Sequence, residues 1–354
     1  MIRKKKYVAL LAGTFLAMSL VMSGCAKENT KTGEGMKAVE KQDYAAALVL
    51  FEQAIVEKED LELAYRGQGL CYLGMTQYDL AIESFDRALS NAGMFVTDTE
   101  VDINYYLATA QYKSGDNAAA LETLNAIADV REKQEEIYYL RGLVKMEMGE
   151  YENAVADLDL ALARSKGDTA MAIRIYQVFA DYGHVQEGKS YLSSALKKHG
   201  DSMTDYELGT VYYYLEDYEN AKSRLEQAKS DGKKEDARTV LMLGKTYEQL
   251  GDSNYAAGVY NQYIENVGPN PEMYNQLGLC KLEVGEYEAA LHAFDSGLAI
   301  EEGNDVVQQL RFNRIVAYEY LGDFEKAASL MNQYLESYPD DGQAVREYEF
   351  LRTR

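Results

Sequence analysis

The chain has 354 residues, 47% hydrophobic and 27% charged, so it holds enough apolar side chains for a folded core. Its formal net charge is -22, and an acidic balance of this size repels phosphate backbones, so the composition argues against nucleic-acid binding. The three cysteines and three histidines are widely scattered, which gives neither a disulfide framework nor a clustered set of metal ligands. We therefore expect no cofactor and no metal site.

The first 24 residues have the layout of an export signal. A basic start, Arg3 to Lys6, is followed by an uncharged and mostly apolar run over residues 7–22. This run is shorter than the ~20 apolar residues of a membrane span but has the length of a signal-peptide core. Ser23 and Gly24 then precede Cys25. An ordinary secretory signal or a buried cysteine is the alternative interpretation.

The stretch VMSGC, ending at Cys25, resembles the lipobox of bacterial lipoproteins. The resemblance implies that residues 1–24 are cleaved and that Cys25 carries the lipid, with palmitate-type acyl chains. Residues 25–34 would then be the lipidated cysteine and a short tether. The mature chain would be anchored in the bacterial cell envelope, facing outside the cytoplasm. Ala26 would direct it to the outer membrane in a diderm, and in a monoderm it would stay on the outer face of the cell membrane.

Residues 35–339 contain a repeated pattern with a period of about 34 residues. Its copies share a small residue at Ala47, Ala81, Ala120, Ala154, Gly188, Ala221, Ala256, Ala290 and Ala327. Twelve positions earlier stands a second small residue, at Gly35, Gly69, Ala108, Gly142, Gly209, Gly244 and Gly278, replaced by Tyr176 and Ile315 in the fifth and ninth copies. Four positions later stands a bulky apolar residue, at Phe51, Phe85, Leu124, Leu158, Leu192, Leu225, Tyr260, Phe294 and Met331. The spacing of four places the small and bulky residues of the second helix on one helical face, and the earlier small residue lets the two helices approach closely.

Glycine-acid turns separate the two predicted helices of most copies. We expect the turn glycines to adopt the left-handed conformation that ends a helix, at Gly115, Gly149, Gly183, Gly251, Gly285 and Gly322.

This pattern closely resembles the tetratricopeptide repeat. The resemblance implies an all-α, right-handed superhelical solenoid of about nine helix-turn-helix repeats over residues 35–339. Residues 340–354 carry apolar side chains at helical spacing (Ala344, Val345, Tyr348 and Leu351) and are predicted to form a C-terminal capping helix. Cys71 and Cys280 both follow a packing glycine by two positions, so we expect them to be buried free thiols.

No nucleophile, phosphate-loop or metal signature occurs, and we predict that the protein is not an enzyme. Acidic pairs such as Glu150 and Glu152, or Asp157 and Asp159, recur with the repeat. We interpret them as solvated helix faces rather than acid-base pairs.

In tetratricopeptide repeats the first helix of each unit lines a concave face that binds partners. Carried over position by position, the resemblance implies a tyrosine-rich binding face that includes Arg66, Tyr105, Tyr112, Lys113, Tyr139, Tyr206, Tyr213, Tyr214, Arg238, Lys245, Asn275 and Phe312. Several of these tyrosines could instead pack between neighbouring helices. The sequence therefore favours a membrane-anchored scaffold or adaptor that binds a peptide or protein partner, in envelope assembly. The alternative is a lipoprotein that captures a small molecule or glycan for a transporter, which predicts a closed pocket.

Overall fold

The computed structural model describes residues 30–94, 96–130, 134–231, 236–300, 306–339 and 341–354, and every regular element in these ranges is a helix. The predicted signal peptide and Cys25 lie outside the described residues. In the described part of the chain, no helix is both long and apolar enough to cross a membrane.

The chain divides into two compact units, which we call the N-terminal unit (described from residue 30 to 195) and the C-terminal unit (196–354). The N-terminal unit contains α1 (Lys31–Glu40), α2 (Tyr44–Glu57), α3 (Leu61–Gly74), α4 (Tyr78–Ser90), α5 (Asp98–Lys113), α6 (Asn117–Val130), α7 (Glu135–Glu147), α8 (Tyr151–Arg164), α9 (Thr169–Asp181) and most of α10 (Val185–His199). The C-terminal unit contains a short 3-10 helix (Gly200–Ser202), α11 (Asp205–Tyr214), α12 (Tyr218–Asp231), α13 (Ala237–Gln249), α14 (Ser253–Asn266), α15 (Pro271–Glu283), α16 (Tyr287–Leu298), α17 (Val307–Leu321), α18 (Phe324–Ser337) and α19 (Gly342–Leu351).

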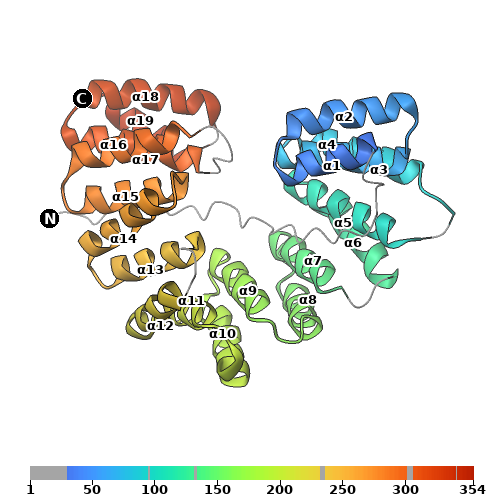
Figure 1. The fold of residues 1–354 in the computed structure, drawn as a ribbon, viewed down its shortest axis with the longest axis horizontal. Coiled ribbons are helices and arrows are strands. Elements are labelled where there is room, and N and C mark those ends of the chain that lie inside the picture. Colours follow the sequence, from blue (N-terminus) through green and yellow to red (C-terminus); the bar gives the residue numbers. More distant parts are fainter. Residues whose placement is uncertain (1–29, 95, 131–133, 232–235, 301–305, 340) are drawn as a thin grey trace. The chain divides into compact units, whose positions relative to one another are not determined.

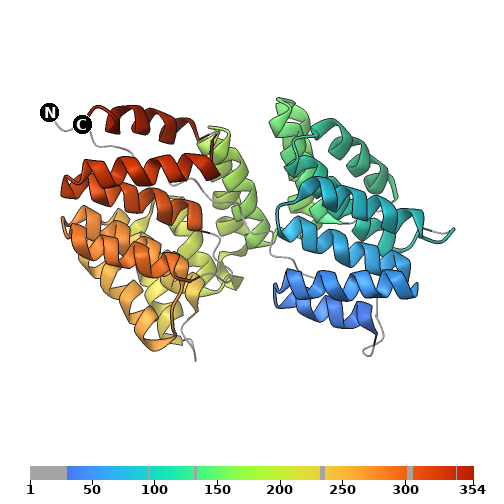
Figure 2. The same cartoon turned by 90° about the horizontal axis from the view of Figure 1, so that it is seen from above.

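Within each unit, consecutive helices pair into hairpins that follow one another in chain order (Figures 1 and 2). The described helices give nine such pairs, from α1–α2 to α17–α18, which confirms the predicted all-α solenoid of repeats. The helix α1 begins at Lys31, so four residues of the predicted tether belong to the first repeat.

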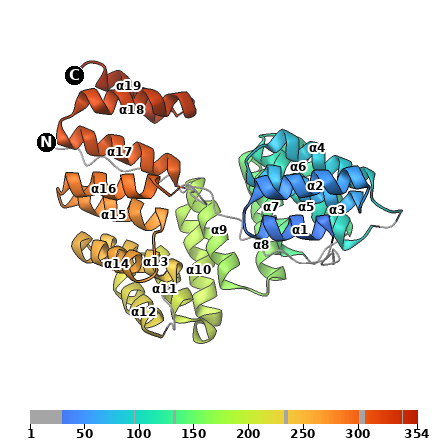
Figure 3. The same cartoon turned by 45° about the horizontal axis from the view of Figure 1, so that its top comes forward.

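Helix α19 packs along α18, as Figure 3 shows. Ala344 and Leu351 are buried in one cluster with Ala327 and Met331 of α18, so the helix caps the last repeat as predicted. Val345, which was expected on the apolar face, is 43% exposed and points away from that cluster.

The turn inside each hairpin is built from local hydrogen bonds. In the third repeat, Gly115 N–H donates to Tyr112 O at 3.0 Å and Asp116 N–H donates to Gln111 O at 2.9 Å, which is the Schellman arrangement. The Asp116 carboxylate then accepts from Ala119 N–H at 3.0 Å and caps the next helix. All six predicted turn glycines have φ between +76° and +88°, so their left-handed conformation is confirmed.

The remaining three turns place a side chain in the same left-handed conformation. These residues are Gln42 (φ 61°), Thr76 (φ 58°) and Glu216 (φ 67°). Their backbone hydrogen bonds match those at the glycine turns; Gln77 N–H, for example, donates to Tyr72 O at 2.8 Å. A β-branched residue such as Thr76 is strained in this region.

Replacing Thr76 with glycine is therefore expected to stabilise the N-terminal unit by about 1 kcal/mol, because removing the strain outweighs the added freedom of the unfolded chain. The measurement is the midpoint of urea unfolding. Ser114, a helix C-cap at φ -78°, is the control, since Ser114→Gly relieves no strain. A midpoint that rises equally in both variants would contradict the explanation.

The predicted small and bulky residues pack against each other inside each repeat. A Cβ atom built on Gly69 would lie 2.5 Å from the Phe85 ring, and one on Gly278 would lie 2.3 Å from the Phe294 ring. A Cβ atom on Gly142 or Gly209 would meet a leucine instead, Leu158 at 2.9 Å or Leu225 at 2.5 Å, and Ala108 is also paired with a leucine, Leu124. Aromatic partners thus occur where the small position is glycine, whereas leucine occurs with either glycine or alanine.

The fifth repeat exchanges the roles of its two small positions. Tyr176 occupies the position that is glycine in six other repeats, and its partner helix carries Gly188 where the other repeats carry alanine. A Cβ atom on Gly188 would lie 3.1 Å from Tyr176 Cδ2 and 3.0 Å from Phe179 Cβ. The absence of a side chain at Gly188 on α10 therefore leaves space for the Tyr176 side chain on α9. In the ninth repeat, Ile315 and Met331 are both buried in one cluster.

Candidate functional site

All twelve predicted site residues lie on the first helices of their hairpins. In the N-terminal unit they are Arg66 on α3, Tyr105, Tyr112 and Lys113 on α5, and Tyr139 on α7. In the C-terminal unit they are Tyr206, Tyr213 and Tyr214 on α11, Arg238 and Lys245 on α13, Asn275 on α15 and Phe312 on α17. They therefore form two groups, one on each unit.

Three of the twelve are buried and tie neighbouring repeats together. Arg66 Nε donates to Asp102 Oδ2 at 2.6 Å, across to the next repeat, and its guanidinium lies 5.8 Å from the Tyr106 ring centroid. Burial raises the pKa of Asp102, and the charge of Arg66 opposes this rise. Asn275 Oδ1 accepts from Asn313 Nδ2 at 2.9 Å, again between repeats. The geometry assigns these side chains a structural role.

Tyr139, the third buried residue, is covered by an arginine of the following repeat. The Arg174 guanidinium lies 3.9 Å from the Tyr139 ring centroid and forms two parallel hydrogen bonds with Glu136, at 2.6 and 2.7 Å. The nearby Tyr105 hydroxyl is buried and makes no hydrogen bond in the described part of the chain. Burial raises the pKa of Tyr105, so this phenol stays protonated.

The other members of the N-terminal group lie at the C-terminal end of α5. Tyr112 is half-buried, and Lys113 is exposed with its Nζ 5.6 Å from the Tyr112 ring centroid. The hydroxyl of Tyr182, the C-cap residue of α9, donates to Glu147 of α7. Burial raises the pKa of Tyr112, and the charges of Glu147 and Asp181 raise it further, while a hydrogen bond with Tyr182 lowers it.

The C-terminal group combines stacked tyrosines with two cations. The Arg238 guanidinium lies 5.6 Å from the Tyr206 ring centroid, and its side chain is 75% exposed. Tyr213 and Tyr214 meet edge to face at 5.4 Å, and Tyr213 packs against the buried core of the unit. Lys245 Nζ lies 3.5 Å from Glu272 Oε1. Tyr206 also packs against this core, and Tyr206, Tyr213 and Tyr214 are all half-buried.

Phe312 of the same group packs within its own repeat and its neighbour. Its ring meets Tyr334 of α18 edge to face, with the centroids 5.7 Å apart. Tyr334 in turn donates to Asp341, the N-cap of α19, at 2.7 Å. This contact makes Phe312 part of the packing that holds the capping helix.

Sequence reasoning missed Arg174 and Tyr182, which complete the N-terminal group. Arg174 lies on α9 and Tyr182 is the C-cap residue of that helix, in the repeat whose small position holds Tyr176. Tyr182 follows its partner Glu147 by 35 residues, one more than the regular period. A site prediction that takes the same positions from every repeat therefore does not include Tyr182. Both residues could have been found in the sequence by also considering arginine and aromatic side chains that lie one position away from the expected site positions of the repeat.

The interpretation of Asp157 as a solvated residue is wrong. Asp157 is 2% exposed, and its carboxylate binds Arg141 Nε and Nη2 at 2.8 and 2.6 Å and Lys145 Nζ at 2.7 Å. The three residues join α7 to α8 inside the fourth repeat. Asp159, in contrast, is exposed and accepts only from the Tyr191 hydroxyl at 2.8 Å.

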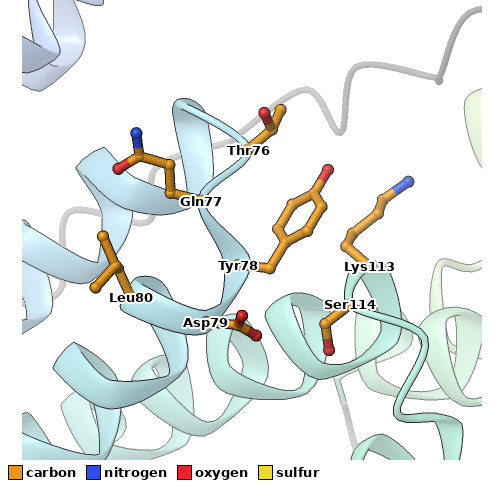
Figure 4. Close-up of a pocket in the computed structure, with 7 residues that line it drawn as sticks. All are labelled: Thr76, Gln77, Tyr78, Asp79, Leu80, Lys113 and Ser114. Atoms are coloured by element: carbon orange, nitrogen blue, oxygen red, sulfur yellow. The ribbon is translucent and has the colours of Figure 1, made fainter. Parts of the chain in front are cut away.

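Among the described residues, no three of the His, Cys, Asp and Glu side chains gather where they could hold a metal ion. Two surface depressions touch the described helices. One, of about 440 Å³, lies between the start of α4 and the end of α5, where the Tyr78 hydroxyl and the Lys113 ammonium point to the same open side (Figure 4). The other, of about 480 Å³, is formed by α12, α13 and α14 around Tyr247 and Tyr255. Of the predicted site residues, only Lys113 lines either one.

The helix pairs, the small-residue packing and the face of first helices define a helical-repeat protein of the binding-scaffold class. The family model described as tetratricopeptide repeat matches residues 32–94, 105–169, 206–271 and 275–342, which together make up more than half of the chain. The chain therefore belongs to the tetratricopeptide repeat family. Most of the fifth repeat, with Tyr176 and Gly188, lies outside the matched segments.

Among curated proteins, the chain is 29% identical over 99 residues to a BBSome complex member of Bos taurus, covering 28% of this chain and 19% of that protein. It is 22% identical over 248 residues to a TPR repeat-containing protein of Methanocaldococcus jannaschii, covering 66% and 42%. The chain thus spans about a fifth and about two fifths of the length of these relatives.

Solved structures with the same type of fold include a tetratricopeptide repeat protein from Parabacteroides merdae (16% identity, TM-score 0.47, covering 71% of this chain and 97% of that one). Another is YrrB, described as a TPR protein with an unusual peptide-binding site (23% identity, TM-score 0.37, covering 54% and 97%). Tetratricopeptide repeat proteins typically act as scaffolds that bind protein or peptide partners.

Proposed function

We propose that the protein is a lipid-anchored, extracytoplasmic scaffold or adaptor that binds a peptide or protein partner on its first-helix faces, in envelope assembly. The observation that carries the proposal is the set of half-buried tyrosines and exposed cations on these faces, beside Tyr112 in one unit and Tyr206 in the other. Tyrosine supplies contact area and a hydroxyl at a low cost in conformational entropy, and arginine and tyrosine are enriched at interfaces.

The lipid anchor is supported by the basic start, the apolar run and the VMSGC stretch around Cys25. α1 begins at Lys31, so few residues separate Cys25 from the first repeat. The first repeat would therefore lie within about 20 Å of the lipid-bearing residue. The same resemblance supports a place in the bacterial cell envelope.

The anchor predicts how many thiols react in the native protein. Cys71 and Cys280 are buried free thiols, and burial raises the pKa of Cys71 to about 12 and also raises that of Cys280. Neither is expected to react with dithionitrobenzoate before unfolding, because thiolate is the reactive form. The native chain purified from membranes should therefore show no fast thiol if Cys25 is acylated. One fast thiol, with an unmodified Cys25 in the mass spectrum, would contradict the anchor.

Partner binding is tested by crosslinking in membranes and mass spectrometry of the recovered proteins. Tyr206→Ala with Tyr214→Ala is expected to lower recovery of the partner at least about tenfold, because it removes two rings from the binding face. Tyr255→Ala is the matched control, since Tyr255 lies on a second helix and is 54% exposed. Equal recovery with all three proteins would exclude the C-terminal face as the binding site.

A further inference from the structure

A cluster of aromatic rings and carboxylates lies where the first helices of the third, fourth and fifth repeats end. It consists of Tyr112 on α5, Glu147 on α7, Asp181 at the end of α9 and Tyr182, the C-cap residue of α9, and we call it the Tyr112 cluster. Tyr182 donates to Glu147, and a hydrogen bond links the phenols of Tyr112 and Tyr182. Both carboxylates lie close enough to Tyr112 to act on its pKa, and both side chains are exposed to solvent.

The two carboxylates have no cationic partner in the described part of the chain. Asp181 is exposed and makes no ion pair with any described residue. Glu147 accepts a hydrogen bond from the Tyr182 hydroxyl. Among the described residues, the cation at the cluster is Lys113, whose Nζ lies over the Tyr112 ring rather than on a carboxylate. The cluster therefore presents two negative charges beside two aromatic rings.

The N-terminal unit contains a second site in which an aromatic ring and a carboxylate lie together, and that site binds a cationic side chain. About two to three helical turns before Glu147 on α7, the Tyr139 ring and the Glu136 carboxylate form a similar pair of groups, and both contact Arg174. The guanidinium stacks on the ring at 3.9 Å and binds the carboxylate through two hydrogen bonds. The Tyr112 cluster has the same kinds of group, aromatic rings and carboxylates, but no arginine of the described chain lies between them.

We propose that the Tyr112 cluster binds a cationic side chain, of lysine or arginine, from an extended segment of the protein partner. This inference rests on the proposed function and names the chemistry of the partner. The cation stacks on the Tyr112 and Tyr182 rings and pairs with the exposed carboxylates of Glu147 and Asp181. The net charge of -22 attracts a basic segment to the protein before contact.

The test measures fluorescence polarisation of labelled nonapeptides on the detergent-solubilised full chain. The peptides carry three lysines, three arginines or three glutamines in the same glycine-serine background, and free spermidine serves as competitor. The lysine or arginine peptide is expected to bind at least about tenfold more tightly than the glutamine peptide, with an affinity that falls as salt is added. Equal binding of the three peptides would overturn the inference. If spermidine binds as tightly as the basic peptides, the ligand of the cluster would be a small cation and not a peptide segment, and the inference would be overturned as well.

Two double variants separate the cluster from the general charge of the protein. Glu147→Gln with Asp181→Asn is expected to weaken the basic peptide about tenfold. Glu52→Gln with Glu122→Gln removes the same charge from exposed positions on second helices, and it should leave binding within about twofold. Equal losses in both double variants would show a long-range charge effect and refute the cluster. Unchanged circular dichroism confirms that each variant is folded.

The same variants distinguish failure of the proposed cation site from failure of the proposed scaffold function. If crosslinking in membranes recovers a partner from the parent chain and equally from the Glu147→Gln, Asp181→Asn variant, the scaffold function stands and the cation site is refuted. If the parent chain recovers no specific partner, the proposed function itself fails. Recovery that falls with the cluster variant and not with the control supports both.

Discussion

Replacing Gly278 with alanine is expected to destabilise the C-terminal unit by about 3 kcal/mol, because the added carbon overfills a packed core. Its Cβ would lie 2.3 Å from Cε1 and 2.6 Å from Cζ of Phe294, a fully buried ring. Repeat arrays do not always unfold in one step, so the measurement is hydrogen exchange of the amides in α15 and α16. These amides should exchange roughly 100-fold faster than in the parent chain.

Two further variants show whether the clash is the cause. Adding Phe294→Leu to Gly278→Ala reproduces the Ala108 and Leu124 pair of the third repeat and should restore most of the protection. Gly258→Ala, in α14, meets nothing within 4 Å and should stabilise the helix by about 1 kcal/mol. A Gly278→Ala protein as protected as the parent, or a Phe294→Leu change that brings no recovery, would rule out volume complementarity.

Asp157→Asn is expected to destabilise the N-terminal unit by about 3 kcal/mol. The change leaves Arg141 and Lys145, whose side chains are 15% and 16% exposed, without the carboxylate that neutralises them. Removing one partner of a buried ion pair leaves an uncompensated buried charge, at a cost of about 3–5 kcal/mol. Hydrogen exchange of the amides in α7 and α8 should show the loss.

Asp159→Asn is the matched control for Asp157→Asn. It lies on the same helix, and its carboxylate is exposed and accepts only from Tyr191, so its loss should cost about 1 kcal/mol or less. Triple replacement of Arg141, Lys145 and Asp157 with methionine, methionine and leucine should recover most of the stability, since it removes the charges together. Equal effects of Asp157→Asn and Asp159→Asn would contradict the role of burial.

The repeat frame could be predicted because its determinants are local. A turn glycine such as Gly115 and the facing pair of Gly69 and Phe85 act within one hairpin, and their spacing is visible along the chain. The same logic failed at Val345, because helical spacing alone does not say how far the buried stripe extends around α19. The sequence of the fifth repeat does show that the first helix carries Tyr176 at its small position and that the second helix carries Gly188. The compensation becomes visible only when the residues of both helices are compared.

The binding face was harder to predict because its burial depends on the neighbouring repeat. Arg66 and Asn275 occupy the same kind of position as Tyr206, yet each is covered by a side chain that lies more than 35 residues further on. Asp157 was misjudged for a related reason, since only the fold brings Arg141 beside it. Position within a repeat therefore predicts which helix carries a residue, and the packing between helices determines its exposure.

The two kinds of contact in this fold have different consequences for how such a chain can evolve. The pairs of glycine and aromatic residue close within a single hairpin, as Gly69 and Phe85 do. Other apolar contacts cross to the next hairpin, since Phe51 of α2 packs against Gly67 of α3. The polar links between Arg66 and Asp102, Glu136 and Arg174, and Asn275 and Asn313 also each join a residue to one in the next repeat. A copied or deleted repeat would therefore keep its own hairpin pair but lose the apolar and polar neighbours that fix its place in the order.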